Sequence, residues 1–267
     1  MLLVIDCGNT NTGFAVYEDI NCVGSWRTST NISRTADEYA VWLTELLALG
    51  GLLIKDIKGI IIANVVPETS FNLINLCEKY FEIRPMVVGE TEVDLGITID
   101  IDDPKEVGAD RVVNAVGALD RYTGSLIIVD FGTATTFDVV DADGTYRGGV
   151  IAPGINLSLE ALYNAAARLP RISISETKNT KSSIKTLNVI GKSTKAAMHS
   201  GIFWGYIGLI EGIVSRIKKE FAKPMTVIGT GGLANIFYDA TDSIDHIDED
   251  ITNAGLVLIY KRNLPWK

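Results

Sequence analysis

Two short stretches of the chain follow the same plan, and their relation constrains the fold more than any other feature. Ile5–Tyr17 reads IDCGNTNTGFAVY, and Val129–Asp141 reads VDFGTATTFDVVD. Aligned on Asp6 and Asp130, they match at a constant offset of 124 residues (130 − 6). Each has an apolar run, an Asp-x-Gly sequence, small polar residues and a second apolar run, which is typical of a β-hairpin. We therefore expect two copies of one plan, with chance similarity between two hairpins as the alternative.

The residues around each hairpin predict strands that alternate with helices. In the first half, Thr35 and Glu38 form a Thr-x-x-Glu capping box that begins a helix, and Gly50 and Gly51 end it. The other elements expected there are strands at 22–28, 57–67 and 86–88 and helices at 68–81 and 106–122. The second half repeats the order, with strands at 126–130, 135–140, 145–151 and 225–229, helices at 155–168 and 194–221, and helices to the end. This order indicates an α/β fold.

Composition and charge exclude several classes of function. With 267 residues, 47% of them hydrophobic, the chain can form one large domain or two small ones. Its formal net charge of -9 argues against binding to nucleic acid, and its most basic stretch, Lys178–Lys185, is typical of a solvated loop. The sequence has neither a signal-peptide pattern nor an apolar run of about 18 residues, the length of a membrane span. We therefore expect a cytoplasmic protein that acts on small molecules.

Cysteine and histidine are not expected to carry the chemistry. Cys7, Cys22 and Cys77 are odd in number and lack CxxC spacing, which indicates reduced thiols rather than disulfides or a zinc site. The two histidines, His199 and His246, offer few ligands for a metal and few candidates for a Ser/His/Asp triad.

The two Asp-x-Gly turns instead favour a nucleoside triphosphate with Mg²⁺. Turns of Gly, Asn and Thr expose backbone N–H groups and hydroxyls with little bulk, which suits phosphate oxygens. Asp6 and Asp130 add carboxylates, and Mg²⁺ typically takes one or two carboxylates together with phosphates and waters. A third glycine-rich stretch, IGTGGLA at Ile228–Ala234, precedes a predicted helix and would let backbone approach a ligand. It matches neither the Walker pattern nor GxGxxG, so a simple tight turn is the alternative there.

These residues resemble the acetate and sugar kinase/actin superfamily and, more narrowly, the type III pantothenate kinases. The narrower resemblance rests on DCGNTNT at Asp6–Thr12, EVGADRVVNAV at Glu106–Val116, DFGTATTFD at Asp130–Asp138 and GGVIAPG at Gly148–Gly154. GKSTKAAMHSG at Gly191–Gly201 and GTGG at Gly229–Gly232 follow in the family's order, so the resemblance covers nearly the whole chain. It implies two ribonuclease H-like halves, residues 1–115 and 116–267, with mixed sheets flanked by helices and a nucleotide cleft between the halves.

The resemblance also implies a reaction. ATP would phosphorylate the primary hydroxyl of pantothenate to give 4'-phosphopantothenate, the first step of coenzyme A biosynthesis. Mg²⁺, a monovalent cation such as K⁺ or NH₄⁺, and a homodimer are implied as well. The alternative is a nucleotide-binding regulator of the same fold without kinase activity. The pair Asp110 and Arg111 favours the enzyme, because a nucleotide sensor has no evident need for it.

The two turns receive their roles from the resemblance. The first turn is expected to bind ATP, with Asp6 near Mg²⁺ and with Asn9 and Thr10 close to the phosphates. Its full set is Asp6, Cys7, Gly8, Asn9, Thr10, Asn11, Thr12 and Gly13. In the second turn, Asp130 is expected to bind the monovalent cation and Thr133 the nucleotide. The alternative for both aspartates is a strand-end carboxylate that caps its own turn.

Asp110 is the expected catalytic residue. In a loose phosphoryl-transfer transition state, a carboxylate aligns the attacking hydroxyl and accepts its proton late. The guanidinium of Arg111 has donors suited to the carboxylate of pantothenate. The expected substrate-binding set is Gly108, Ala109, Asp110, Arg111 and Thr194. An Asp-Arg pair on a helix is otherwise common as surface decoration, and the Gly-Ala before it and the family motif favour the substrate role.

Several positions and one stretch leave questions for the structure. By resemblance, Thr194 reaches the substrate of the neighbouring subunit, although Ser193 or Thr194 could instead cap the following helix. Ile101 lies seven residues before Gly108, where relatives often have a tyrosine that contacts pantothenate. The polar stretch 173–188 is longer than usual and is expected to form a surface loop that could influence substrate access. Apolar positions of the long helix, namely Ile202, Phe203, Ile207 and Ile210, could face either the core or a partner.

Overall fold

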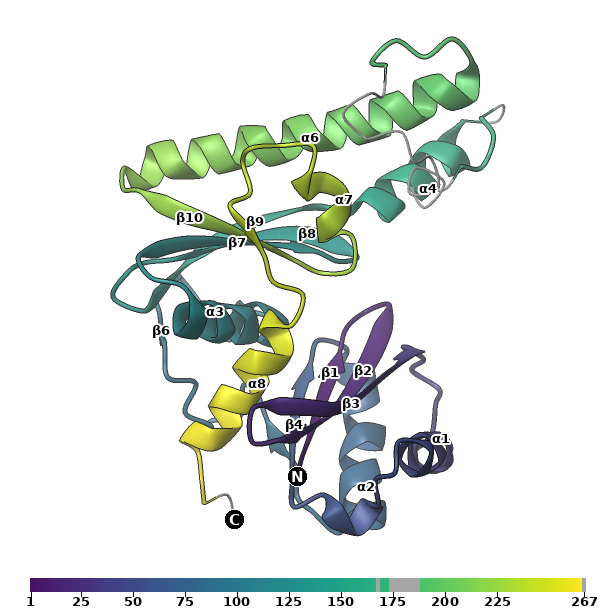
Figure 1. Ribbon diagram of the computed structural model, residues 1–267, viewed down its shortest axis with the longest axis vertical. Helices are drawn as coiled ribbons and strands as arrows, with labels where there is room; N and C mark the ends of the chain where they lie inside the picture. The colour runs from purple at the N-terminus through teal and green to yellow at the C-terminus, as the bar shows by residue number, and fades with distance from the viewer. Residues whose placement is uncertain (167–168, 173–187, 266–267) are drawn as a thin grey trace. The chain divides into compact units, whose positions relative to one another are not determined.

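The computed structural model describes residues 1–166, 169–172 and 188–265, and its chain forms two compact units (Figure 1). Unit 1 contains residues 1–121 together with the segment that begins at residue 250, and unit 2 contains residues 122–249. The predicted polar loop at 173–188 lies outside the described residues, apart from Asn188. No helix within the described ranges is long and apolar enough to cross a membrane.

The sheet of unit 1 has the strand order β3-β2-β1-β4-β5. β2 is antiparallel to both β1 and β3, whereas β4 is parallel to β1 and β5 is parallel to β4. The strands are β1 (Leu2–Cys7), β2 (Asn11–Glu18), β3 (Asn21–Ser29), β4 (Gly59–Asn64) and β5 (Met86–Val87), and a short β6 (Thr98–Ile99) follows. The helices are α1 (Ala36–Leu49), α2 (Ser70–Tyr80), α3 (Ala109–Arg121) and α8 (Ile251–Arg262), with 3₁₀ turns η1 (Ile54–Asp56), η2 (Pro67–Thr69) and η3 (Pro104–Glu106).

Alternation along β1 determines which way Asp6 points. Leu3 and Ile5 are buried in one core with residues of α1 and α2, and Leu2 and Val4 in another with residues of α3 and α8. Because successive side chains of a strand point to opposite faces, Asp6 shares the face of Leu2 and Val4. The fold therefore directs this carboxylate to the face of the sheet that α3 and α8 cover.

The C-terminal helix α8 belongs to unit 1, which differs from the predicted halves 1–115 and 116–267. Its backbone approaches that of α3 so closely that only glycine fits at two positions. A Cβ atom on Gly117 would lie 2.2 Å from the carbonyl oxygen of Ile251, and one on Gly255 would lie 2.1 Å from that of Val113. A division of the sequence at a single point cannot place α8 with the first half, because the contact between α3 and α8 joins residues far apart in the sequence.

Within unit 2, the neighbouring strands run β9-β8-β7-β10-β11, which repeats the order of the first sheet. The strands are β7 (Ser125–Phe131), β8 (Ala134–Val140), β9 (Thr145–Pro153), β10 (Met225–Thr230) and β11 (His246–Ile247), and the described helices are α4 (Ile155–Ala165), α6 (Thr194–Phe221) and α7 (Ala234–Tyr238). The predicted repeat is confirmed. Asp6 pairs with Gly13 and Asp130 with Thr136, so the second turn is one residue shorter than the first.

The long helix α6 packs on this sheet through the apolar positions that the sequence left unassigned. Phe203, Ile207 and Ile210 are buried in the core of unit 2, whereas Ile202 is partly buried against it. The ring of Phe203 stacks on that of Phe237 of α7 with centroids 6.0 Å apart. These three positions therefore face the core rather than a partner.

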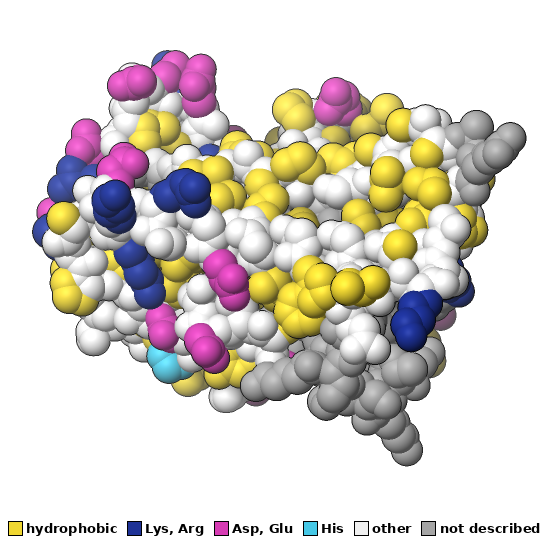
Figure 2. Space-filling model, turned by 90° about the horizontal axis from the view of Figure 1, so that it is seen from above, with side chains coloured by type: hydrophobic (Ala, Val, Ile, Leu, Met, Phe, Trp, Pro, Cys, Tyr) yellow, Lys and Arg dark blue, Asp and Glu magenta, His cyan; other side chains and the backbone are white. Residues whose placement is uncertain are grey.

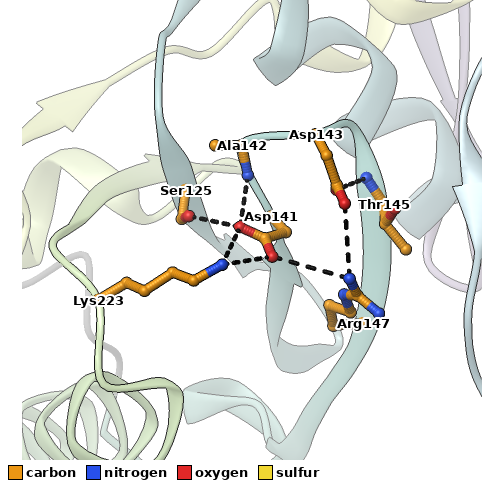
Figure 3. A network of polar contacts seen from close by, with 7 residues as sticks. All are labelled: Ser125, Asp141, Ala142, Asp143, Thr145, Arg147 and Lys223. Atoms are coloured by element: carbon orange, nitrogen blue, oxygen red, sulfur yellow. Dashed lines mark hydrogen bonds and ion pairs between the residues drawn. The ribbon is translucent and has the colours of Figure 1, made fainter.

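A polar network around Asp141 joins three segments of unit 2 (Figure 3). The Asp141 carboxylate accepts hydrogen bonds from Lys223 Nζ at 2.8 Å, from Ser125 Oγ at 2.9 Å and from the Ala142 N–H at 2.7 Å. In decreasing order, these donors hold the pKa of Asp141 down to about 2. The network ties the start of β7 and the β8–β9 turn to the segment before β10.

Candidate functional site

The first Asp-x-Gly turn presents its tip to solvent and buries its base. Asn9, Thr10 and Asn11 are exposed, and the Gly8 N–H closes the turn by donating to the Asn11 carbonyl at 3.0 Å. The side chains of Cys7 and Thr12 are buried beneath it. Of the predicted ATP-binding residues, these two therefore have only backbone groups to offer, and their assignment stays a prediction.

A hydroxyl network beneath the turn fixes the direction of its peptides. Thr30 Oγ1 donates to the Gly8 carbonyl at 2.6 Å and shares a hydrogen bond of 2.9 Å with Thr12 Oγ1. In a trans peptide the C=O and the following N–H point in opposite directions. The Asn9 N–H therefore faces away from the network, as an anion-binding turn requires. Thr30 follows β3 and lies in no motif, so no pattern in the sequence indicates its role.

Two aspartates of the predicted site are brought together within unit 1. Burial raises the pKa of Asp6 to about 6, and the negative charge of Asp110 adds to the rise, while Arg27 opposes it. A buried carboxylate whose ionisation is also hindered by a neighbouring negative charge forms a site that a cation would stabilise. Because Mg²⁺ typically takes one or two carboxylates together with phosphate oxygens and waters, the pair fits this ion. Among the described residues no group of three or more His, Cys, Asp or Glu could hold a metal.

Asp110 lies at the beginning of α3, where Gly108 leaves room for its carboxylate. A Cβ atom on Gly108 would lie 2.6 Å from Asp110 Oδ1, which also accepts the Arg111 N–H at 2.8 Å. Burial raises the pKa of Asp110, and the N–H and the charge of Arg111 offset part of the rise. Both side chains are half-buried, unlike surface decoration. Ile101, which precedes this helix, is half-buried as well.

The second turn, in unit 2, is surrounded by glycine-rich backbone. A Cβ atom on Gly231 would lie 2.5 Å from Asp130 Oδ1, and one on Gly154 would lie 2.1 Å from the Thr133 carbonyl. Gly231 also has φ of +88°, which favours glycine. The stretches DFGT, APG and GTGG thus meet around Asp130 and Thr133. The GTGG stretch is therefore more than an isolated tight turn, because it makes room for the Asp130 carboxylate.

Thr194 is not the cap of the long helix. Ser193 occupies the N-cap, and its Oγ accepts the Ala196 N–H at 3.2 Å. Thr194 is the first residue of α6 and is exposed. Its predicted role toward a neighbouring subunit's substrate is compatible with this position and stays a prediction.

Comparisons with known proteins show which family and which fold this chain is similar to. A family model described as type III pantothenate kinase matches residues 2–216. A curated protein of that name from Rhodospirillum rubrum is 58% identical over 265 residues, which cover 99% of this chain and 100% of the relative. A solved structure described as a Baf family transcriptional activator from Campylobacter jejuni has a TM-score of 0.60 at 19% identity over 98% of both chains. Another, described as a 2-dehydro-3-deoxygalactonokinase from Sinorhizobium meliloti, has a TM-score of 0.56 at 14% identity and covers 100% of this chain and 98% of its own. The two structures show that the fold is of the sugar kinase/actin type, as expected.

Proposed function

The chain belongs to the type III pantothenate kinase family, and we propose that it carries out the family's reaction with the residues described above. The reaction is the ATP-dependent phosphorylation of pantothenate to 4'-phosphopantothenate, the first step of coenzyme A biosynthesis. The regulatory alternative is not favoured, because the curated relatives are named as kinases at identities that reach 58%. The observation that carries the proposal is that the Asp110 carboxylate lies close enough to Asp6, within unit 1, for its charge to raise the pKa of Asp6.

Asp110 acts on the hydroxyl of pantothenate in this proposal. Its raised pKa moves the carboxylate toward the range in which a base is effective at neutral pH. As the hydroxyl oxygen bonds to the γ-phosphorus, the bond to the β–γ bridging oxygen breaks and its electron pair leaves with ADP, while Asp110 accepts the hydroxyl proton. Gly108 and Ala109 give the substrate access to this carboxylate, and Arg111 binds the carboxylate of pantothenate.

The carboxylates of Asp6 and Asp130 indicate where the two cations of the reaction would bind. Asp6, with Asp110 beside it, would hold Mg²⁺ close to the first turn, where Asn9 and Thr10 approach the phosphates of ATP. Bound there, Mg²⁺ neutralises charge on the phosphate oxygens. Asp130 would bind K⁺ or NH₄⁺ beside Gly231, and Thr133 the nucleotide. Activity in K⁺ should exceed activity in Na⁺ at equal ionic strength, and equal activities would remove this role from Asp130.

A homodimer is proposed for the exposed side of α6. Four glycines, Gly201, Gly205, Gly208 and Gly212, recur there at helical spacing, and the first three are exposed with nothing within 4 Å of an added Cβ. Val189 and Ile190, just before α6, are exposed at 67% and 83%. Figure 2, which views the molecule from the α6 side, shows further hydrophobic side chains on this face. A second copy packed here would place Thr194 at the interface, and Gly205→Glu should make a dimer dissociate in sedimentation velocity.

The decisive experiment is formation of 4'-phosphopantothenate from ATP, measured by mass spectrometry with Mg²⁺ and K⁺ present. Wild-type protein should form the product, and Asp110→Asn should lose about 100-fold or more in turnover while still binding ATP. Asp120→Asn is the matched control, because Asp120 is exposed on the same helix. Near-normal turnover in Asp110→Asn would contradict the catalytic assignment, and ATP binding without product in the wild type would contradict the kinase. A cytoplasmic location is proposed with this activity and is tested by cell fractionation.

A further inference from the structure

Arg27 lies in line with Asp6 across the sheet of unit 1. Asp6 of β1 is paired with Gly13 of β2, and Gly13 is paired with Arg27 of β3. Residues directly opposite each other in an antiparallel sheet project from the same face. Trp26, the preceding residue, packs on the α1 and α2 side, which places Arg27 on the opposite face with Asp6. No motif includes Arg27, and its place in the site comes from strand register alone.

Gly13 leaves a gap between these two charges. A Cβ atom added to Gly13 would meet only the backbone oxygen of Asp6, at 3.8 Å, so the space above it is open. Two strand spacings separate the backbones of Asp6 and Arg27 by about 10 Å, and an arginine side chain spans part of that distance. The exposed residues Asn9 and Thr10 lie in the turn that joins Asp6 to Gly13 along the chain. A phosphate group beside Asp6 would therefore have the guanidinium on its other side.

The negative charge near Asp6 favours a cationic group beside the phosphates. Asp6 and Asp110 are negative, and the transferring phosphoryl group and ATP add more negative charge. Burial and the charge of Asp110 raise the pKa of Asp6, and the exposed Arg27, the smallest of the three influences, lowers it. Phosphoryl transfer depends on cationic groups that stabilise the equatorial oxygens, and a guanidinium suits them because its donors form a fixed fork.

We propose that Arg27 is a further catalytic residue, whose guanidinium donates to the γ-phosphoryl oxygens of ATP across the gap above Gly13. This inference rests on the kinase activity proposed above. As the bond between the γ-phosphorus and the bridging oxygen breaks and the pantothenate oxygen takes its place, Arg27 stabilises the charge on the three equatorial oxygens. Asp110 receives the hydroxyl proton, and Arg27 stays protonated throughout the step.

The test compares Arg27→Gln and Arg27→Lys with wild type by kcat and by KM for each substrate. Arg27→Gln should lower kcat by about 100- to 1,000-fold, the range for one lost electrostatic stabiliser, and leave KM for pantothenate within twofold. Arg27→Lys should restore part of the loss, because it keeps the charge but not the fork. Arg262→Gln is the control, since Arg262 is an exposed arginine of the same unit that pairs with Asp94. Thermal unfolding of each variant checks that the fold is retained.

A pH profile separates phosphate contact from an effect through Asp6. If Arg27 contacts the phosphoryl group, the loss in Arg27→Gln persists from pH 6 to pH 9. If Arg27 only lowers the pKa of Asp6, activity returns as the pH rises, and that result would overturn the inference, as would a kcat within threefold of wild type. Wild-type protein runs in the same assay, so absence of product there contradicts the proposed function itself.

Discussion

Replacing Gly108 with alanine would displace the Asp110 carboxylate without changing its chemistry. The added Cβ would lie 2.6 Å from Asp110 Oδ1, whereas ordinary contacts begin near 3.4 Å, so the oxygen must move by about 0.8 Å. A displacement of about 1 Å of a catalytic group can lower a rate by about 100-fold. We therefore expect Gly108→Ala to reduce kcat by about 100-fold while the protein stays folded and binds ATP with unchanged affinity.

The measurement is steady-state kinetics of product formation, with ATP affinity from calorimetry. Gly50→Ala is the control, because Gly50 has an ordinary φ of -80° and its added Cβ would approach no atom closer than 3.3 Å. That variant should keep its kcat. If Gly108→Ala kept kcat within threefold of wild type, the position of the Asp110 carboxylate would not limit turnover, and the catalytic assignment of Asp110 would be weakened with it.

Three further predictions concern stability and the first turn. The Asp6 carboxyl has a pKa of about 6 in the folded protein but near 4 in the unfolded chain, so its contribution to stability falls as the pH rises from 4 to 6. Asp6→Asn should therefore stabilise the ligand-free protein above pH 6, by at most about 3 kcal/mol. Thermal melts test this, and a stability gain that persisted at pH 4 would refute the reasoning. Gly255→Ala should lower the unfolding free energy in urea by about 1–3 kcal/mol, because its Cβ would press on the Val113 carbonyl, and an unchanged midpoint would disprove the close contact. Thr30→Val removes the donor to the Gly8 carbonyl and should raise KM for ATP about 10-fold with KM for pantothenate unchanged, whereas Thr30→Ser should behave as wild type.

The sequence predicts the elements best where local signals are complete. The helix expected over 194–221 is observed as Thr194–Phe221, because Ser193 caps its start and Ala222 ends it in the left-handed conformation. The helix expected from 106 instead begins at Ala109, since the preceding Pro104–Glu106 forms a 3₁₀ turn. The two-residue strand β11 was missed within the helices predicted to the end, because a strand so short has no periodicity to detect.

Only those site residues that lie within sequence motifs could be predicted. Asp6 and Asp110 are visible in sequence because each lies in a recognisable stretch, and the structure brings them together. Arg27 and Thr30 come to the first turn through strand register and a side-chain hydrogen bond. Neither relation leaves a local pattern in the sequence, since register is set by the pairing of whole strands.

The return of α8 to unit 1 has a consequence for how the protein is made. Residues 1–121 emerge from the ribosome with one face of their sheet incomplete, because Leu256 and Ile259 of α8 complete its core. At about 5–20 residues per second, the remaining 141 residues up to Arg262 take roughly 7–30 s to follow. During that interval the nascent chain exposes apolar surface. Unit 2 is continuous in sequence and can fold before the unit that was begun first, so completion of unit 1 waits for the last helix to be synthesised.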